Sequence, residues 1–450
     1  MGFTFVDLFA GIGGFHLALG NLGGRAVFVS EKDPHARAIY ERNFGPSVDG
    51  DIVGDIVPLT RGRLDSRIGN HDILTAGFPC QPFSKSGFQR GISETRGTLF
   101  YNIAKVIESR RPRVVLLENV RNLLGVRHIA TWELIRRTLL ELGYATSVRP
   151  TVFSPHLLPK ELLGTPQVRE RVFIVAVRVG PKRASAIQDL PLLLPNRPVE
   201  GWDPKQWNLR ESVIQADITA EEALSSSLSD QDEHVLEIWD DFVRSLGVEG
   251  KRRLPGHPLW SDEFGRSTEI DNSWPAWKKD FVNKNANFYR QFRGEIDAWL
   301  SRNPPLRRFP ASRRKFEWQA QDMQSLWDGL IQMRPSGIRV KPANYAPALV
   351  AINQRSIYGP LRRRLTTREA ARLQGFPDTF SFGSQPDAQS FKQLGNAVSV
   401  GVATQILRQA AYEWPIFPTD IGEQILGAGD DLGLPNVRLA FGQRMNEAQP

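Results

Sequence analysis

Cysteine is almost absent from this chain, which has one, Cys80, among its 450 residues. A single cysteine excludes an intrachain disulfide, and it forms no cluster with the seven histidines that would suggest a zinc site. We therefore expect no metal and a reducing, cytoplasmic setting. No apolar run approaches the length of a transmembrane helix, and no basic, signal-like segment precedes the first strand pattern, so we expect neither a membrane partner nor an export signal.

Acidic residues are outnumbered in this chain, with 49 of them against 57 basic residues and a net charge of +8. A moderate basic excess fits a nucleic-acid partner, although many unrelated proteins share it. No internal repeat or low-complexity tract is evident. The length allows two or three domains with cores of their own.

The single cysteine lies between two prolines, Pro79 and Pro82, directly after the short apolar run 72–77. This run ends at glycine and predicts a buried strand, so Cys80 is expected on a stiff loop at the strand's carboxyl end. Ligands bind at that end in open α/β sheets. A lone cysteine is more commonly a small buried side chain, but a loop containing Gly, Gln and Ser favours an exposed, nucleophilic thiol.

Strand and helix patterns alternate around this loop. We expect strands at 4–10, 25–30, 114–117, 145–153 and 171–177, and helices at 15–19, 99–107 and 131–142. The alternation predicts an α/β fold with a doubly wound, mostly parallel sheet. Glycines 11, 13 and 14 follow the first strand and allow the backbone to approach a nucleotide closely. Their spacing differs from the dinucleotide fingerprint, which disfavours NAD.

Charged side chains follow several of the expected strands. Glu31 ends the second strand, where an acidic residue either accepts hydrogen bonds from a ribose or is a solvated loop charge. Asp51 and Asp55 lie in a near-repeat, and either could end the next strand. Glu118 ends the strand beside the one that carries Cys80, so we interpret it as a site residue.

Two arginines alternate in the segment 167–171, so Arg169 and Arg171 are expected on one face of extended chain. Such a pair suits a phosphate or a polar base edge, or else belongs to a solvated edge strand.

The α/β alternation stops near residue 180. A helix at 229–246 is predicted there, and its aromatic residues are expected in a core. Basic runs at 307–315 and 362–364 are interleaved in part with Phe309, Phe316 and Trp318, which favours a nucleic-acid surface. Beyond them we expect a short helix at 367–374, a last helix from 393 to about 412, and a loosely held tail from 420.

Taken together, these motifs resemble those of the DNA (cytosine-5) methyltransferases, in the order in which that family has them. The matching stretches are 7–14, 77–84, 118–120, 167–171, 368–377 and 393–398. The resemblance implies a Rossmann-like methyltransferase domain over 1–180, completed by 361–412. It also implies a smaller target-recognition insert at 181–360, and it leaves 413–450 as a C-terminal tail.

The resemblance implies a role for each residue around the base. Cys80 would add to C6 of cytosine, which makes C5 nucleophilic. Glu118 would hold or protonate N3, and Arg169 would donate to the O2 edge with Arg171 in support. Asn119 would fix the loop geometry.

The methyl donor implied by the resemblance is S-adenosylmethionine. Its adenine amine would meet Asp51, which we prefer to Asp55, and its ribose would meet Glu31. The full set of expected donor-binding residues is Asp7, Phe9, Gly11, Gly14, Glu31, Asp51, Ile52, Pro79, Asn396 and Val398.

The implied substrate is duplex DNA, from which the target base must be flipped out at a cost of roughly a few kcal/mol. We expect a monomer of restriction-modification type, acting on DNA in the bacterial nucleoid, alone or beside a cognate restriction endonuclease. Two alternatives stay open: an RNA cytosine-5 methyltransferase and a catalytically silent DNA-binding protein of the same fold.

Overall fold

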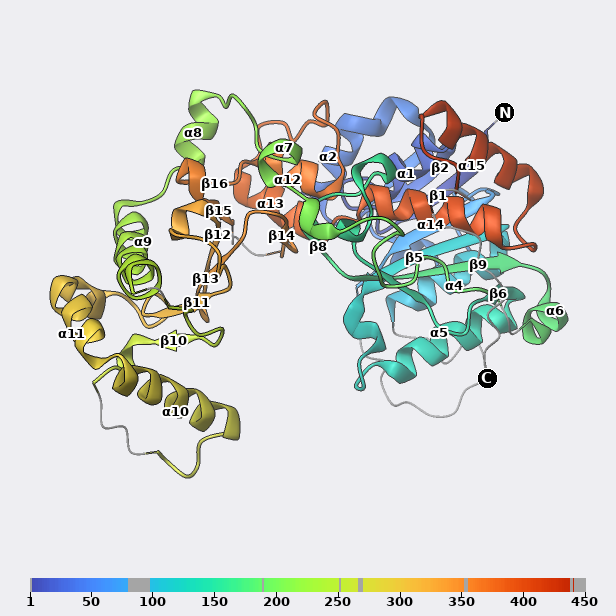
Figure 1. Cartoon of the computed structure of the whole chain (residues 1–450). Coiled ribbons are helices and arrows are strands. Elements are labelled where there is room, and N and C mark those ends of the chain that lie inside the picture. The colour runs from blue at the N-terminus through green and yellow to red at the C-terminus, as the bar shows by residue number, and fades with distance from the viewer. Residues whose placement is uncertain are drawn as a thin grey trace. The chain divides into compact units, whose positions relative to one another are not determined.

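The computed structural model describes residues 2–79, 98–187, 190–250, 252–265, 270–351, 355–437 and 440 (Figure 1). Cys80, the expected nucleophile, lies outside the described residues. The chain divides into a first unit, Met1–Trp207 with Ala371–Pro450, and a second unit, Asn208–Ala370. Residues 181–207 belong to the first unit, where the indole nitrogens of Trp202 and Trp207 each donate to the carbonyl of His156 at 3.0 Å.

The first unit is built on an eight-stranded sheet in the order β3-β2-β1-β4-β5-β9-β6, with β7 pairing with β9. The strands from β3 to β5 in this order are parallel, whereas β9 is antiparallel to β5, β6 and β7. Their bounds are β1 Thr4–Leu8, β2 Arg25–Ser30, β3 Val48–Val53, β4 Ile73–Gly77, β5 Val114–Val120, β6 Tyr144–Thr146, β7 Thr151–Phe153 and β9 Arg171–Arg178. The short β8, Gln167–Val168, is not part of this sheet. The predicted doubly wound, mostly parallel sheet is thereby confirmed.

Helices cover both faces of this sheet. Figure 1 shows α4 and α5 on one face and α1, α14 and α15 on the other. The helices are α1 Gly14–Asn21, α2 Pro34–Phe44, α3 Ile56–Leu59, α4 Leu99–Arg110, α5 Ile129–Glu141, α6 Pro181–Ala186, α12 Thr367–Gln374, α13 Asp387–Asn396, α14 Val400–Glu413 and α15 Thr419–Asp431. Apolar side chains such as Ile103 and Ile135 pack against Leu74 and Val115 in one continuous core.

Two expectations for the C-terminal part of the chain are wrong. The expected single helix from 393 is broken: α13 ends at Asn396 and α14 begins at Val400. The first part of the tail expected to be loose from 420, up to Asp431, instead belongs to α15, whose Ile421 and Ile425 are buried. Apolar residues spaced four apart indicate such a helix, so the sequence did carry a signal for it.

The second unit packs helices against a six-stranded sheet in the order β10-β11-β13-β12-β15-β16. Its elements are α7 Leu209–Ser212, α8 Ala220–Ser226, α9 Asp230–Phe242, a π-helical turn at Val243–Glu249, α10 Ala276–Gln291, α11 Arg293–Arg302, β10 Leu259–Trp260, β11 Lys315–Trp318, β12 Leu330–Arg334, β13 Gly337–Lys341, β14 Ala346–Pro347, β15 Ile357–Tyr358 and β16 Arg363–Arg364. The helix predicted at 229–246 and its aromatic core are confirmed, since Trp239 and Phe242 are fully buried. The sheet was not predicted.

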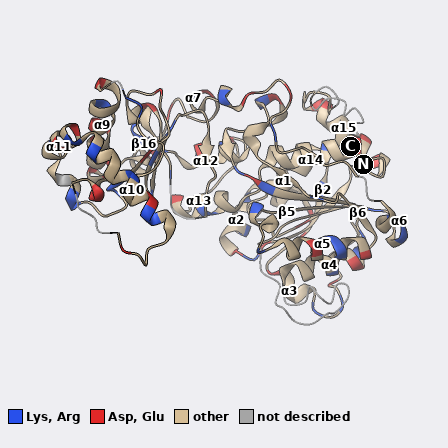
Figure 2. Cartoon of the chain, turned by 60° about the horizontal axis from the view of Figure 1, so that its bottom comes forward, with Lys and Arg blue, Asp and Glu red and all other residues tan. Residues whose placement is uncertain are grey.

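The basic runs of the second unit do not form the aromatic stacking surface that we expected. Phe316 and Trp318 are buried in the core, at 0% and 2% exposure, so they offer no face to a base. Arg314 pairs with Asp262 at 3.2 Å and Arg364 with Asp232 at 2.6 Å. Lys and Arg are accordingly interspersed with Asp and Glu in Figure 2.

Candidate functional site

A cleft of about 690 Å³ opens in the first unit at the carboxyl ends of β1, β2, β4 and β5. Parallel strands place the residues that follow them at one edge of a sheet, which is where α/β proteins bind ligands. Eight of the residues expected from the sequence line it: Phe9, Gly11, Glu31, Pro79, Glu118, Arg169, Arg171 and Asn396. Asp55, the alternative to Asp51, lines it as well. Residues far apart in the chain therefore meet at a single site.

The turn from β1 to α1 forms one wall of the cleft with an unusual backbone. Phe9 has φ = 56°, a left-handed conformation that is strained for an aromatic residue and is found most often at functional sites. Gly11 has φ = 58°, and a Cβ placed on it would meet nothing within 4 Å. The backbone at Gly11 is therefore open to a ligand.

Glu31 holds this turn from the end of β2. Its carboxylate accepts hydrogen bonds from the backbone N–H of Gly11 at 2.8 Å and of Asp33 at 2.7 Å. Burial raises the pKa of Glu31, while these two hydrogen bonds lower it. The carboxylate is thus fixed in place while it lines the cleft.

The two candidate aspartates of the near-repeat at 50–56 differ in position, since Asp51 lies within β3 and Asp55 follows it. Asp51 and Ile52 lie within β3, and Asp51 is exposed and is not among the residues that line the cleft. Asp55 and Ile56 do line it. Asp55 caps α3 by accepting from the N–H of Val57 at 3.0 Å, which fixes its carboxylate.

Asp7 lies beneath the cleft in β1 rather than on its surface, and it is completely buried. One carboxyl oxygen accepts from the hydroxyl of Thr75 at 2.8 Å, and the other has no partner among the described residues. Burial raises the pKa of Asp7 from 3.8 to about 8, with Glu31 adding to the rise. The side chain is therefore mostly protonated at neutral pH.

Glu118 and Arg171 meet at the other end of the cleft. The Nε of Arg171 lies 3.2 Å from Oε1 of Glu118. Burial raises the pKa of Glu118, and Arg171 and Arg169 oppose that rise. The carboxyl is therefore easier to protonate than an exposed glutamate, and it lies beside a guanidinium group.

Asn119 fixes the backbone that leads to the cysteine loop. Its amide donates to the carbonyl of Phe78 at 2.9 Å, and its Oδ1 accepts from the N–H of Val120 at 2.8 Å. Pro79, the residue before Cys80, lines the cleft. The role expected for Asn119 in the geometry of the loop itself stays a prediction.

Arg169 is occupied by backbone partners. Its Nη2 donates to the carbonyls of Gly395 at 2.9 Å and of Ala397 at 2.8 Å, and its side chain is almost fully buried. Burial, with a smaller contribution from neighbouring Arg171, lowers its pKa to about 9. Arg169 thus ties β8–β9 to the break between α13 and α14.

That break presents the last two expected donor-binding residues. Asn396 lines the cleft, and Val398 packs against the start of α1. A Cβ on Gly14 would lie 2.7 Å from the carbonyl oxygen of Val398, so only glycine permits this close approach.

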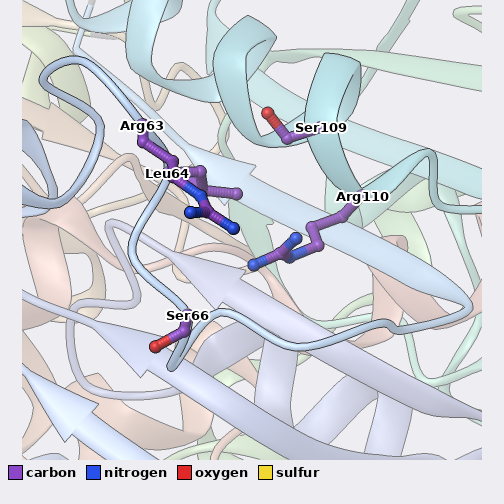
Figure 3. Close-up of a pocket in the computed structure, with 5 residues that line it drawn as sticks. All are labelled: Arg63, Leu64, Ser66, Ser109 and Arg110. Carbon is purple, nitrogen blue, oxygen red and sulfur yellow. The ribbon is translucent and has the colours of Figure 1, made fainter.

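A second cavity of about 570 Å³ lies elsewhere in the first unit and contains none of the expected site residues. It is lined by Arg63, Leu64, Ser66, Ser109 and Arg110, and Figure 3 shows the guanidinium groups of Arg63 and Arg110 pointing toward one another. Arg110 donates to the carbonyls of Ile68 and Asp65, which accounts for it as a loop anchor.

Within the described part of the chain, no helix is long and apolar enough to cross a membrane. The same residues contain no group of three or more His, Cys, Asp and Glu side chains able to hold a metal ion.

The chain is similar in sequence to a known protein family and to several of its members. The family model for C-5 cytosine-specific DNA methylases matches residues 3–411. The Type II methyltransferase M.AluI of Cellulosimicrobium cellulans is 42% identical over an alignment of 479 residues, covering 90% of this chain and 91% of that protein. M.HhaI of Haemophilus parahaemolyticus is 41% identical over 177 residues, covering 39% and 50%. A prophage-encoded E. coli structure described as a DNA modification methyltransferase aligns with a TM-score of 0.49 at 21% identity, covering 90% and 97%.

Proposed function

We propose that Cys80, Glu118 and Arg171 act directly on the target base. This proposal proceeds from the family, because the chain belongs to the C-5 cytosine-specific DNA methylases and is a DNA (cytosine-5) methyltransferase. The observation that supports this most is the pairing of Glu118 with Arg171 in a cleft that Pro79 also lines. The proposed reaction begins with addition of the Cys80 thiolate to C6 of a flipped-out cytosine.

Each proposed proton transfer has a group suited to it. As the Sγ–C6 bond forms, electrons move into the ring, and protonated Glu118 donates its proton to N3. The raised pKa of Glu118 favours that protonated form. C5 then takes up the methyl group, and N3 returns its proton to Glu118. A water molecule accepts the proton of C5, and the electrons of that C–H bond re-form the C5–C6 double bond and expel the thiolate of Cys80. The chain's residues are thereby restored.

The two arginines have different proposed roles. Arg171 borders the cleft beside Glu118, so we assign to it the donation to O2 of the base. Arg169 is instead a positioning residue, because its guanidinium already donates to Gly395 and Ala397. This assignment reverses the expectation that Arg169 donates to O2 with Arg171 in support.

The residues at the β1–α1 end of the cleft fit S-adenosylmethionine. The cleft volume lies in the usual range for small-molecule sites, and the backbone at Gly11 is open. Phe9 and Asn396 would border the donor, Glu31 would accept from its ribose, and Asp55 rather than Asp51 would lie near its adenine. When bound, S-adenosylmethionine supplies an electrophilic methyl group.

The remaining parts of the proposal concern partners. The second unit would recognise the DNA sequence, and the enzyme would act as a monomer on DNA in the cytoplasm, alone or with a cognate restriction endonuclease. Duplex DNA is preferred to RNA as the substrate because the matching family and relatives are DNA methylases.

The test is transfer of labelled methyl groups from S-adenosylmethionine to unmethylated duplex DNA and, in parallel, to tRNA. Wild-type protein should label DNA, whereas Cys80→Ala should abolish labelling and keep its affinity for the donor. Bisulfite sequencing of the product would then locate the modified cytosines. Equal labelling by Cys80→Ala would overturn the covalent mechanism, and labelling of tRNA alone would overturn the substrate.

A further inference from the structure

Three neighbouring strands of the second unit, β11, β13 and β12, have one apolar face and one strongly basic face. Side chains alternate between the two faces of a strand, so every second residue belongs to the same face. Phe316, Ile338 and Val340 point into the aromatic core and are fully buried. The intervening residues, apart from buried Leu330 and from Gly337, form the opposite face together with Gln319, which directly follows β11. We call this the basic face: Lys315, Glu317, Gln319, Gln332, Arg334, Arg339 and Lys341.

The strand register brings these residues together. Glu317 of β11 lies opposite Arg339 of β13, which lies opposite Gln332 of β12. Residues directly opposite one another across a sheet have Cβ atoms roughly 5 Å apart. The basic face is therefore a contiguous surface rather than a scatter of charges.

A single carboxylate organises the guanidinium groups on this face. Nη2 of Arg334 lies 2.7 Å from Oε2 of Glu317, and Nε of Arg339 lies 3.0 Å from the same oxygen. Gln319 also donates to Glu317, whose side chain is only 9% exposed. A nearly buried carboxylate shared in this way fixes the direction of both arginine side chains.

The charge on this face is out of balance. The three strands carry four cations against one carboxylate, a net of +3. Lys341 lies close enough to Arg339 and Arg334 for both to lower its pKa, after the larger effect of burial. Like charges on adjacent strands repel, so an anionic ligand would relieve the repulsion. Other basic side chains of this unit, such as Arg314 and Arg364, each have an acidic partner of their own.

We propose that the basic face contacts the duplex DNA substrate, with Glu317 positioning Arg334 and Arg339 toward acceptor atoms of the DNA. This rests on the proposed function of the second unit. Fixed guanidinium groups suit the acceptor edge of guanine, and glutamines that of adenine, while Lys341 suits a phosphate.

Two variants that keep both partners of Glu317 charged test the proposal. Lys341→Gln and Arg339→Lys should each raise the KM for unmethylated plasmid DNA by about fivefold or more, with little change in kcat. A plot of the logarithm of the DNA-binding constant against the logarithm of the salt concentration should also have a slope smaller in magnitude by about one in Lys341→Gln. The matched controls are Lys284→Gln and Arg302→Lys, since these cations pair with Asp280 and Asp241 elsewhere in the same unit.

The controls should stay within about twofold of wild type in DNA affinity, and all four variants should keep wild-type affinity for S-adenosylmethionine. Wild-type KM for DNA in both test variants would overturn the proposal. That failure is distinct from failure of the proposed function, in which wild-type protein itself would transfer no methyl group.

The positioning role of Glu317 has its own test in Glu317→Gln, which adds one positive charge to the face. If charge alone mattered, this variant would bind DNA more tightly. We expect weaker binding, because the guanidinium groups lose the carboxylate that orients them. Tighter binding would overturn the positioning role, and a urea unfolding curve for each variant checks that the second unit is intact.

Discussion

Replacing Asp7 by asparagine should change the way in which the stability of the first unit depends on pH. Asp7 is completely buried, and its pKa is raised from 3.8 to about 8, chiefly by burial and to a smaller extent by Glu31. The other titratable side chain coupled to it is Tyr40, whose own pKa rises by burial and by the charge of Asp7. Asparagine has nearly the same shape and does not titrate in this range.

The sign of the effect follows from proton linkage. Asp7 ionises near pH 4 in the unfolded chain and near pH 8 in the folded chain. The contribution of Asp7 to the stability of the folded protein is therefore greatest below pH 4 and falls as the pH rises to 8. Each pH unit in this window changes the free energy of unfolding by about 1.4 kcal/mol. Between pH 5.5 and 7.5, the free energy of unfolding of wild type should therefore fall by about 3 kcal/mol, and that of Asp7→Asn should not show this fall.

The measurement is urea unfolding of both proteins at each pH, followed by the difference between their free energies of unfolding. Taking the difference removes the contribution of groups that titrate in both proteins. The free energy of unfolding of Asp7→Asn should increase steadily relative to that of wild type as the pH rises. A difference that does not vary between pH 5.5 and 7.5 would show that Asp7 is ionised in the folded protein.

Further predictions concern the cleft. Methyl transfer should slow as the pH rises through the raised pKa of Glu118, because the protonated carboxyl is the donor to N3. In Glu118→Gln, kcat should fall roughly 10²–10⁴-fold, and the decrease in kcat with rising pH should disappear. Arg171→Ala should lower kcat and leave the affinity for the methyl donor unchanged. Arg169→Ala should weaken donor binding and lower the urea concentration at which half the protein is unfolded. Stopped-flow kinetics and calorimetry that gave each variant the other's result would reverse the two roles. Asp55→Ser, which keeps a helix cap, should weaken donor binding about fivefold in calorimetry, and Asp51→Ser should not.

Much of the first unit was predictable because its signals are local. A short apolar run followed by an acidic residue places Glu31 and Glu118 at strand ends without knowledge of the rest of the fold. The choice between Asp51 and Asp55 was harder, since both lie in nearly identical sequence. What separates them is that β3 continues through Asp51, whereas Asp55 starts a helix as its cap.

The second unit shows where local signals fail. Its strands are two to five residues long and pair with partners distant in the chain, such as β12 with β15. Alternation over so few residues cannot be distinguished from a loop. The arginines at 313–314 and 362–364 looked like a nucleic-acid surface because the acids that pair with them, Asp232 and Asp262 among others, lie far away in the sequence.

The break between α13 and α14 has the same kind of cause, and it bears on catalysis. The apolar pattern alone predicts one continuous helix from residue 393, yet Arg169 takes the carbonyls of Gly395 and Ala397, more than 220 residues away, as its acceptors. Thr165 likewise donates to the carbonyl of Leu373 at 2.8 Å. The two segments of the first unit, separated by the whole second unit, are thus joined by the arginine motif. Because Asn396 and Val398 lie at that junction, the cleft is complete only after the last quarter of the chain has packed onto the first.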